Sequence, residues 1–182
     1  MLRLLEYELY KSEINSIKIN LMPIIKLYTT IKAPIDICFG LATSIDLHKI
    51  STSHTKEEAI AGKTNGLIGL NEFVTWEATH FGIKQQLTTK ITAYEKPFHF
   101  RDEQVKGIFK LLKHDHFFEQ IGNETVMLDS FEYESPFGIV GHIFNKTVLT
   151  NYLTKFLNIR NNLIKEFAET EKWKIVLGEK SY

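Results

Sequence analysis

The chain has 182 residues, of which 43% are hydrophobic and 24% are charged, so it can form one domain with a substantial core. Its 22 basic and 22 acidic residues cancel, which leaves no basic surface to attract a nucleic-acid backbone. No apolar run approaches the roughly 18 residues that a membrane span needs, and a single cysteine, Cys38, excludes an internal disulfide. We therefore expect a cytoplasmic protein that neither binds nucleic acid nor inserts into a membrane.

The first part of the chain predicts an extension, a strand and two short helices. Residues 1–21 are interpreted as an N-terminal extension, poorly ordered or not native, because Met22 offers a second translation start. Residues 24–32 alternate and are rich in β-branched side chains, which favours a strand. Pro34 suits the first turn of a helix, and Thr43 or Ser44 is suited to end that helix and cap the next.

The rest of the chain predicts six strands and one long helix. Residues 58–135 follow period-two alternation, and their short turn-like connections imply antiparallel neighbours. From about Gly141 to Glu169 the apolar spacing changes to i, i+3, i+4, which indicates an amphipathic helix. Since no linker or repeat interrupts this pattern, we expect a single domain over residues 22–170 and a tail over residues 171–182.

This β-α-α-β6-α order defines an α+β protein whose sheet must cover the one large apolar helix. The chain resembles the helix-grip fold of the START and polyketide-cyclase (SRPBCC) superfamily, and within it bacterial proteins described as ligand-binding SRPBCC domains. The most specific matching segments are 76–82 (WEATHFG), 102–104 (DEQ), 114–117 (HDHF) and 133–138 (YESPFG). The resemblance covers Ile24 to about Ala168. It implies a curved seven-stranded antiparallel sheet around the C-terminal helix, with a cavity that captures a small hydrophobic or amphipathic molecule.

Two histidines lie in the mostly apolar run of residues 111–118 (LLKHDHFF). Whether they point into the molecule or toward solvent decides how much can be inferred about function. In a strand, His114 and His116 share one face. We assign this face to the interior, because the opposite face carries Lys113 and Asp115, which are costly to bury. In the last strand, the more apolar register places Asp129 inside as well.

The other strands differ in how clearly they indicate an inner face. The better inner faces contain Val74, Trp76, Ala78 and His80 in the third strand, and Leu87, Thr89 and Ile91 in the fourth. The fifth strand stays open, because Phe100, Asp102 and Gln104 alternate with Arg101, Glu103 and Val105, and either choice buries a charge.

These faces predict a polar patch inside an apolar pocket. Its members are His80, His114, His116 and Asp129, joined by Asp102 and Gln104 if the fifth strand turns that face inward. Such a patch orients a ligand through a few hydrogen bonds. It also suits acid–base catalysis, with His114 or His116 as base and Asp129 or Asp102 as its orienting partner. The alternative is that these groups only satisfy one another or lie at a solvated mouth.

Aromatic residues and one arginine complete the candidate ligand site. The aromatic wall candidates are Trp76, Phe118, Phe131, Tyr133, Tyr152 and Phe156, for which the alternative is plain core packing. Arg160 lies close to the apolar stripe of the last helix, where it can pair with a ligand carboxylate or with Asp129, or extend to solvent. We expect no metal site and no cofactor, since His114 and His116 lack a helical H-E-x-x-H motif or a cysteine pair nearby.

Three functions remain open at this point. The first is a binding module for a small hydrophobic or amphipathic ligand between the sheet and the last helix. The second is an enzyme of the cyclase, hydratase or hydrolase kind that uses a His/Asp pair in the same cavity. The third is a protein-interaction domain in stress or cell-division processes. The sequence leaves the ligand and the oligomeric state undetermined.

Overall fold

The computed structural model describes residues 23–80, 82–135 and 148–178. Its elements in chain order are β1 (Ile24–Ile31), α2 (Ile35–Ala42), α3 (Ile45–Ser51), η1 (Ser53–Thr55), β2 (Glu58–Gly62), β3 (Phe73–His80), β4 (Ile83–Glu95), β5 (His99–Lys106), β6 (Leu111–Ile121), β7 (Glu124–Glu134), α5 (Thr150–Ala168) and α6 (Trp173–Leu177). The predicted extension, residues 1–21, and the predicted start of the long helix at Gly141 lie outside the described residues. The short helix α6, within the predicted tail, was not expected.

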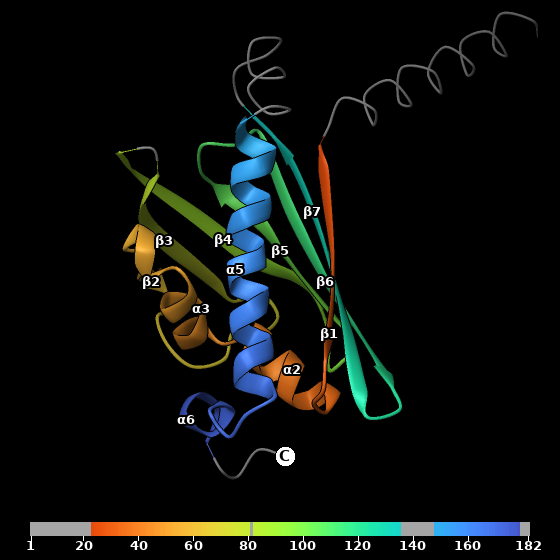
Figure 1. Ribbon diagram of the computed structural model, residues 1–182. Helices are drawn as coiled ribbons and strands as arrows, with labels where there is room; N and C mark the ends of the chain where they lie inside the picture. Colours follow the sequence, from red (N-terminus) through yellow and green to blue (C-terminus); the bar gives the residue numbers. More distant parts are fainter. Residues whose placement is uncertain (1–22, 81, 136–147, 179–182) are drawn as a thin grey trace, which may run out of the picture.

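Seven strands form one antiparallel sheet in the order β1-β7-β6-β5-β4-β3-β2. Helix α5 lies across one face of this sheet, with α2 and α6 near its C-terminal end (Figure 1). The pairing of β4 with β5 is irregular between Thr88 and Thr89 and between Ile91 and Ala93. Such bulges bend a strand and increase its twist, which helps the sheet to curve around the helix. The predicted α+β helix-grip architecture is therefore confirmed.

The helices follow from local signals in the sequence. Pro34 is the N-cap of α2, one position earlier than predicted, and the Ser44 hydroxyl caps α3 by accepting a 3.2 Å hydrogen bond from the backbone N–H of Leu47. Helix α5 turns a mostly apolar face toward the sheet, although Arg160 and Asn161 are buried on that face. Within the described residues, no helix combines the length and apolarity that crossing a bilayer requires.

A tight turn sets the register of β6 against β7. Ile121 pairs with Glu124, so Gly122 and Asn123 form the connection, and Gly122 has a φ of +59°. Glycine adopts this left-handed conformation without steric cost, and a glycine in the first turn position suits a tight hairpin. The resulting register puts His116 directly opposite Asp129. Because a slip of one residue exchanges the two faces of a strand, this turn determines which side chains point inward.

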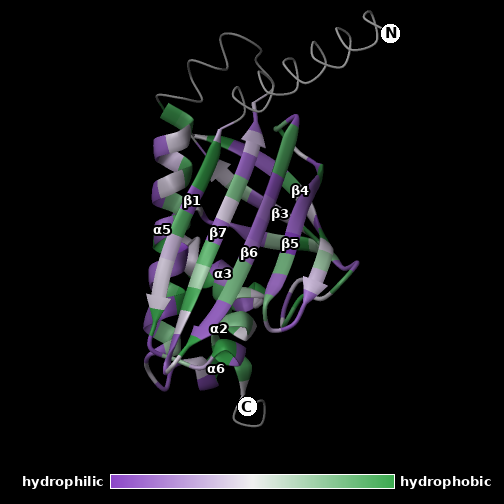
Figure 2. Ribbon diagram, turned by 90° about the vertical axis from the view of Figure 1, so that its right-hand side faces the viewer, coloured by the Kyte–Doolittle hydropathy of each residue, from purple (hydrophilic) through white to green (hydrophobic). Residues whose placement is uncertain are grey.

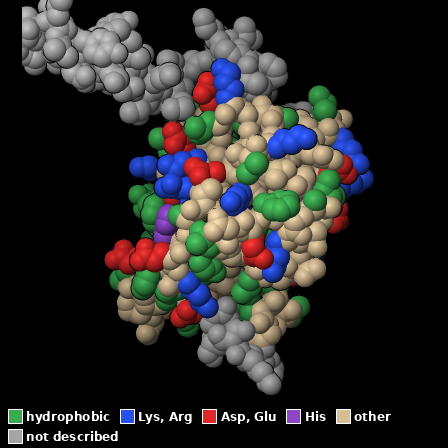
Figure 3. Space-filling model, turned by 180° about the vertical axis from the view of Figure 1, so that it is seen from behind, with side chains coloured by type: hydrophobic (Ala, Val, Ile, Leu, Met, Phe, Trp, Pro, Cys, Tyr) green, Lys and Arg blue, Asp and Glu red, His purple; other side chains and the backbone are tan. Residues whose placement is uncertain are grey.

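The two faces of the sheet have different surroundings. Hydrophobic and hydrophilic residues are interleaved along β6 and β7 (Figure 2), and Leu112, His114, His116 and Phe118 are all buried. One core cluster joins α2 residues such as Phe39 to Met127 of β7. A second cluster joins Leu112 and Tyr133 of the sheet to the first half of α5. On the opposite side of the molecule, charged and hydrophobic side chains are scattered without a dominant patch (Figure 3). The inner faces predicted for β3, β4, β6 and β7 agree with this burial. Asp115, which we expected to be too costly to bury, is nevertheless buried on the opposite face of β6, where His99 and Arg101 pair with it.

Candidate functional site

A cavity of about 600 Å³ lies between the sheet and α5. Most of its lining side chains are apolar, among them Ala78 and Leu87 from the sheet and Leu153 and Leu157 from α5. The segment from Ala42 to His48, where α2 ends and α3 begins, also lines the cavity. Polar side chains gather at two places on this wall, and their chemistry decides what the cavity can hold.

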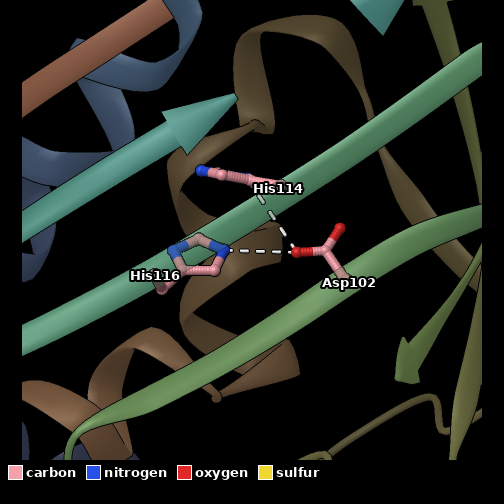
Figure 4. A group of neighbouring side chains, drawn as sticks. All are labelled: Asp102, His114 and His116. Carbon is pink, nitrogen blue, oxygen red and sulfur yellow. Dashed lines mark hydrogen bonds and ion pairs between the residues drawn. The ribbon is translucent and has the colours of Figure 1, made fainter. Parts of the chain in front are cut away.

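The first polar group is the histidine cluster, which we define as Asp102, His114, His116 and Asp129. Asp102 comes from β5, the two histidines from β6 and Asp129 from β7. The His116 Nε2 atom lies 3.2 Å from the Asp102 Oδ2 atom, and the His114 Nδ1 atom lies 3.9 Å from the same oxygen (Figure 4). The imidazole rings are 3.7 Å apart at their centroids, and His116 stacks on Phe100 at 4.1 Å. Neighbouring aromatic rings thus hold both imidazoles in place.

Asp129 is the hub of the histidine cluster. Its side chain is fully buried, and its Oδ1 atom lies 2.9 Å from the His114 Nε2 atom in a hydrogen bond. The His116 Nδ1 atom also lies 2.9 Å from Oδ1 but is not aligned for a hydrogen bond. The Asn161 amide donates to Oδ2 at 2.6 Å. Burial by itself raises the pKa of Asp129, but the hydrogen bond from His114 and the two adjacent imidazoles outweigh it and hold this pKa well below its usual range.

Burial and charge also affect the other members of the histidine cluster. Burial lowers the pKa of His114, and the neighbouring His116 lowers it further, while Asp129 opposes both effects. Burial raises the pKa of Asp102, but the hydrogen bond with His116 and the nearby cationic groups outweigh this effect, so the net pKa is lowered. The two carboxylates therefore stay ionised at neutral pH, and the His114 imidazole favours its neutral form.

Arg160 brings a buried positive charge to the same wall of the cavity. Its Nη2 atom donates to the Ala42 carbonyl oxygen at 2.8 Å, which ties α5 to the end of α2. Its Nη1 atom lies 3.9 Å from the Asp129 Oδ1 atom and makes no hydrogen bond to any described residue. A buried N–H without an acceptor is costly, so this donor is suited to a ligand oxygen.

The second polar group consists of His48, Glu57, His80 and Tyr152, all of which line the cavity. The His48 Nε2 atom lies 3.2 Å from the Glu57 Oε1 atom, while the buried Glu57 Oε2 atom accepts no hydrogen bond from any described residue. The His80 Nδ1 atom and the Tyr152 hydroxyl are 2.7 Å apart. Burial lowers the pKa of His80. This group therefore contains a buried carboxylate oxygen without a described hydrogen-bond donor.

The structure places most of the candidate residues on the cavity wall. The wall includes Trp76, His80, Asp102, His114, His116, Phe131, Tyr152, Phe156 and Arg160. The fifth strand, which the sequence left open, turns Phe100 and Asp102 inward.

Four candidates lie outside the cavity lining, for separate reasons. Gln104 binds both the backbone N–H and the carbonyl of Phe109 in the β5–β6 turn. Phe118 packs in the core against Phe39, and the Tyr133 hydroxyl bonds the Thr150 hydroxyl at 2.7 Å. Asp129 lies behind the two histidines. For Phe118 and Tyr133, the alternative of plain core packing therefore describes their position, and Gln104 is a turn-stabilising residue.

Sequence reasoning missed Asn161, His48 and Glu57. Asn161 follows Arg160 in the predicted helix, and two successive polar residues beside an apolar stripe were the available signal. Glu57 precedes β2 in a segment without periodicity, so nothing in the pattern indicated its burial. His48 lies in α3 and stacks near Trp76 with centroids 4.2 Å apart.

No protein-family model matches the chain, and no curated protein sequence matches it either. Solved structures do match. The Zhui aromatase/cyclase from Streptomyces sp. R1128 has 13% identity and a TM-score of 0.65, over 81% of this chain and 94% of that chain. A START superfamily protein from Mycobacterium smegmatis has 11% identity and a TM-score of 0.61, over 80% and 97% of the two chains. The ginseng major latex-like protein 151 from Panax ginseng has 19% identity and a TM-score of 0.60, over 82% and 99%. The chain therefore shares the fold of these proteins, the helix-grip fold expected from the sequence.

Proposed function

We propose that the protein binds a small amphipathic molecule in the cavity between the sheet and α5. The observation that carries this proposal is the cavity itself, whose volume of about 600 Å³ is within the range of small-molecule sites. A mostly apolar wall favours an apolar ligand body, because burying that body removes its surface from water. The protein is thus a binding module first, in line with the expectation from the sequence.

The polar groups of the wall define where the ligand's polar atoms lie. The unsatisfied Arg160 Nη1 donor suits a carboxylate, carbonyl or hydroxyl oxygen of the ligand. The unsatisfied Glu57 Oε2 acceptor suits a hydroxyl or amine of the ligand. Because both atoms are buried, a ligand oxygen at Arg160 and a ligand donor at Glu57 satisfy them only when the two side chains turn toward the cavity. A pure hydrocarbon satisfies neither and is expected to bind more weakly.

A pair of matched substitutions in β3 tests the proposal. Ala78 lines the cavity, whereas its neighbour Thr79 is exposed on the other face of the strand. We expect Ala78→Phe to fill part of the cavity and to weaken binding of an environment-sensitive naphthalene sulfonate dye about tenfold or more. Thr79→Phe adds the same side chain outside and should leave binding unchanged. Fluorescence titration measures both, with circular dichroism as the check on folding. Equal affinities for the two folded variants would contradict the proposal.

A second candidate, an acid–base enzyme in the same cavity, is favoured by one observation. The 2.9 Å bond from His114 Nε2 to Asp129 orients the imidazole, and this leaves the Nδ1 atom as the ring's available base. Native mass spectrometry of protein from its own host, followed by extraction of the bound molecule, separates the two functions. The extracted molecule is then incubated with wild-type protein and with His114→Gln. If only the wild-type protein changes it chemically, the protein is an enzyme. If both return it unchanged, it is a binding module.

A further inference from the structure

We propose that Asp102, His114 and His116 bind a divalent transition-metal ion such as Zn²⁺ or Fe²⁺ at the wall of the cavity. One carboxylate oxygen and two imidazole nitrogens, all within 4.8 Å of one another, form this candidate metal site. Two histidines and one carboxylate are donors that both ions accept. The sequence led us to expect no metal, because no helical H-E-x-x-H motif or cysteine pair accompanies His114 and His116.

The distances between the donor atoms are close to those of a metal site. Ligand bonds of about 2.1 Å place neighbouring donors roughly 3.0–3.5 Å apart, in octahedral or tetrahedral geometry. The Asp102 Oδ2 atom lies 3.2 Å from the His116 Nε2 atom and 3.9 Å from the His114 Nδ1 atom. Figure 4 shows the carboxylate turned toward both rings. The two imidazole nitrogens lie within 4.8 Å of each other, so rotation of the Asp102 carboxylate and of the two rings is needed to bring all three donors to metal-ligand spacing.

The carboxylate next to the second nitrogen of each ring is another reason to expect a metal. A metal-binding histidine commonly donates its other ring N–H to a carboxylate, which fixes the tautomer. Here His114 Nε2 and His116 Nδ1 both lie 2.9 Å from the single Asp129 Oδ1 atom. The Asn161 amide holds the other oxygen of Asp129. The His114 Nε2–H group donates to Asp129, which leaves the His114 Nδ1 atom free to face Asp102. His116 Nδ1 lies 2.9 Å from Asp129 without a hydrogen bond, while its Nε2 atom faces the Asp102 oxygen.

A cation between these nitrogens and Asp102 also improves the charge balance. Two carboxyl groups, Asp102 and Asp129, lie against the two imidazoles at the cavity wall, and Arg160 brings one guanidinium group. A proton can bridge only one nitrogen to Asp102, whereas a metal ion contacts all three donors at once. With three protein ligands, the ion keeps open coordination positions on the cavity side, where a ligand oxygen can bind. The ion binds whether or not the cavity holds an organic molecule.

Metal titration of the full chain tests this inference. After treatment with a chelator and dialysis, we expect one Co²⁺ per chain to bind with a visible absorption spectrum, and Zn²⁺ to displace it. Asp102→Ala should weaken Co²⁺ binding about 100-fold or more, since it removes a direct ligand. Asp129→Asn keeps a side chain of the same shape and should weaken it about 10–100-fold through the ring orientation alone.

The matched control is His99→Ala. His99 lies on β5 and pairs with the Asp115 carboxylate at 2.7 Å, a histidine–carboxylate pair without a second histidine ligand. This variant should bind Co²⁺ as the wild type does. Absence of stoichiometric Co²⁺ and Zn²⁺ binding by the folded wild type would overturn the inference, and so would unchanged binding by folded Asp102→Ala and His116→Gln. Dye binding by metal-free protein is measured separately, so a failed metal site and a failed ligand cavity give different results.

Discussion

The inner and outer faces of β5 and β6 carry the same kinds of side chain in opposite surroundings. On the outer face, the Asp115 carboxylate lies 2.7 Å from both the His99 Nε2 atom and the Arg101 Nε atom. On the inner face, two carboxylates contact two histidines, and Arg160 reaches them from α5. The outer group forms a compact ion pair. The inner group leaves donor atoms unsatisfied beside a cavity.

The difference comes from what covers each face. Arg101 keeps 31% of its side chain exposed, so water solvates the part that Asp115 does not contact. Arg160 is only 8% exposed in its side chain, and its Nη1 atom has neither water access nor a described hydrogen-bond partner. Burial without full pairing is costly, and such groups concentrate at functional sites. The comparison indicates that residue type alone does not identify a site, whereas incomplete satisfaction inside a cavity does.

The largest expected effect that separates the two faces is the loss of Asp129. Asp129→Ala removes the acceptor for His114 and Asn161 and leaves Arg160 without its nearest carboxylate. We expect it to reduce the free energy of unfolding by about 3–5 kcal/mol, because it strands a buried charge. Asp115 is itself buried, but its partners Arg101 and His99 are partly exposed and can turn to water, so Asp115→Ala on the outer face should cost only about 1 kcal/mol. Urea denaturation measures both values. Equal losses of unfolding free energy would show that the inner group is no better shielded from water than the outer group.

A smaller effect is expected along α5, where Asn161 faces the sheet and Asn158 faces solvent. Asn161→Ala leaves the Asp129 Oδ2 atom without its 2.6 Å amide donor and should destabilise the fold by about 1–3 kcal/mol. Asn158 only donates to the Thr154 carbonyl oxygen on the exposed side, so Asn158→Ala should change stability by less than about 0.5 kcal/mol. Thermal unfolding of the two variants at matched concentration compares them. A loss of equal size in both would assign the effect to the helix rather than to the contact with Asp129.

Strong patterns in the sequence were sufficient to predict the fold and part of the histidine cluster. Alternation in β6 predicted inward histidines because Lys113 made the opposite face expensive to bury, and the more apolar register of β7 placed Asp129 inside. The i, i+4 spacing of α5 predicted the helix that covers the sheet. In each case, burying one face costs clearly more free energy than burying the other. The difference between the two registers was therefore large enough to predict from the sequence.

The missed features have no such contrast. Both faces of β5 carry charged residues, and the bulges in its pairing with β4 shift the register locally, so alternation could not choose between them. Gln104 shares the face of Asp102, but the turn at residues 107–110 offers its amide backbone partners. Glu57 and His48 meet only through the packing of α3 against the end of the sheet. Contacts of this kind depend on tertiary structure, and local periodicity contains no information about them.

The smallest expected effect concerns the pH dependence of the outer face. Burial raises the pKa of Asp115, but hydrogen bonds from Arg101 and His99 outweigh it, so the net pKa is lowered. A carboxyl group with a lowered pKa in the folded state stabilises the protein above its ordinary pKa of about 3.9, and this stabilisation is lost as the pH falls through the folded value. We therefore expect wild type to exceed Asp115→Asn by about 1 kcal/mol in unfolding free energy at neutral pH, and the gap to shrink below about pH 4. Urea titrations between neutral and acidic pH measure it, and a gap that widens on acidification would mean that Asp115 is held by something other than its cationic partners.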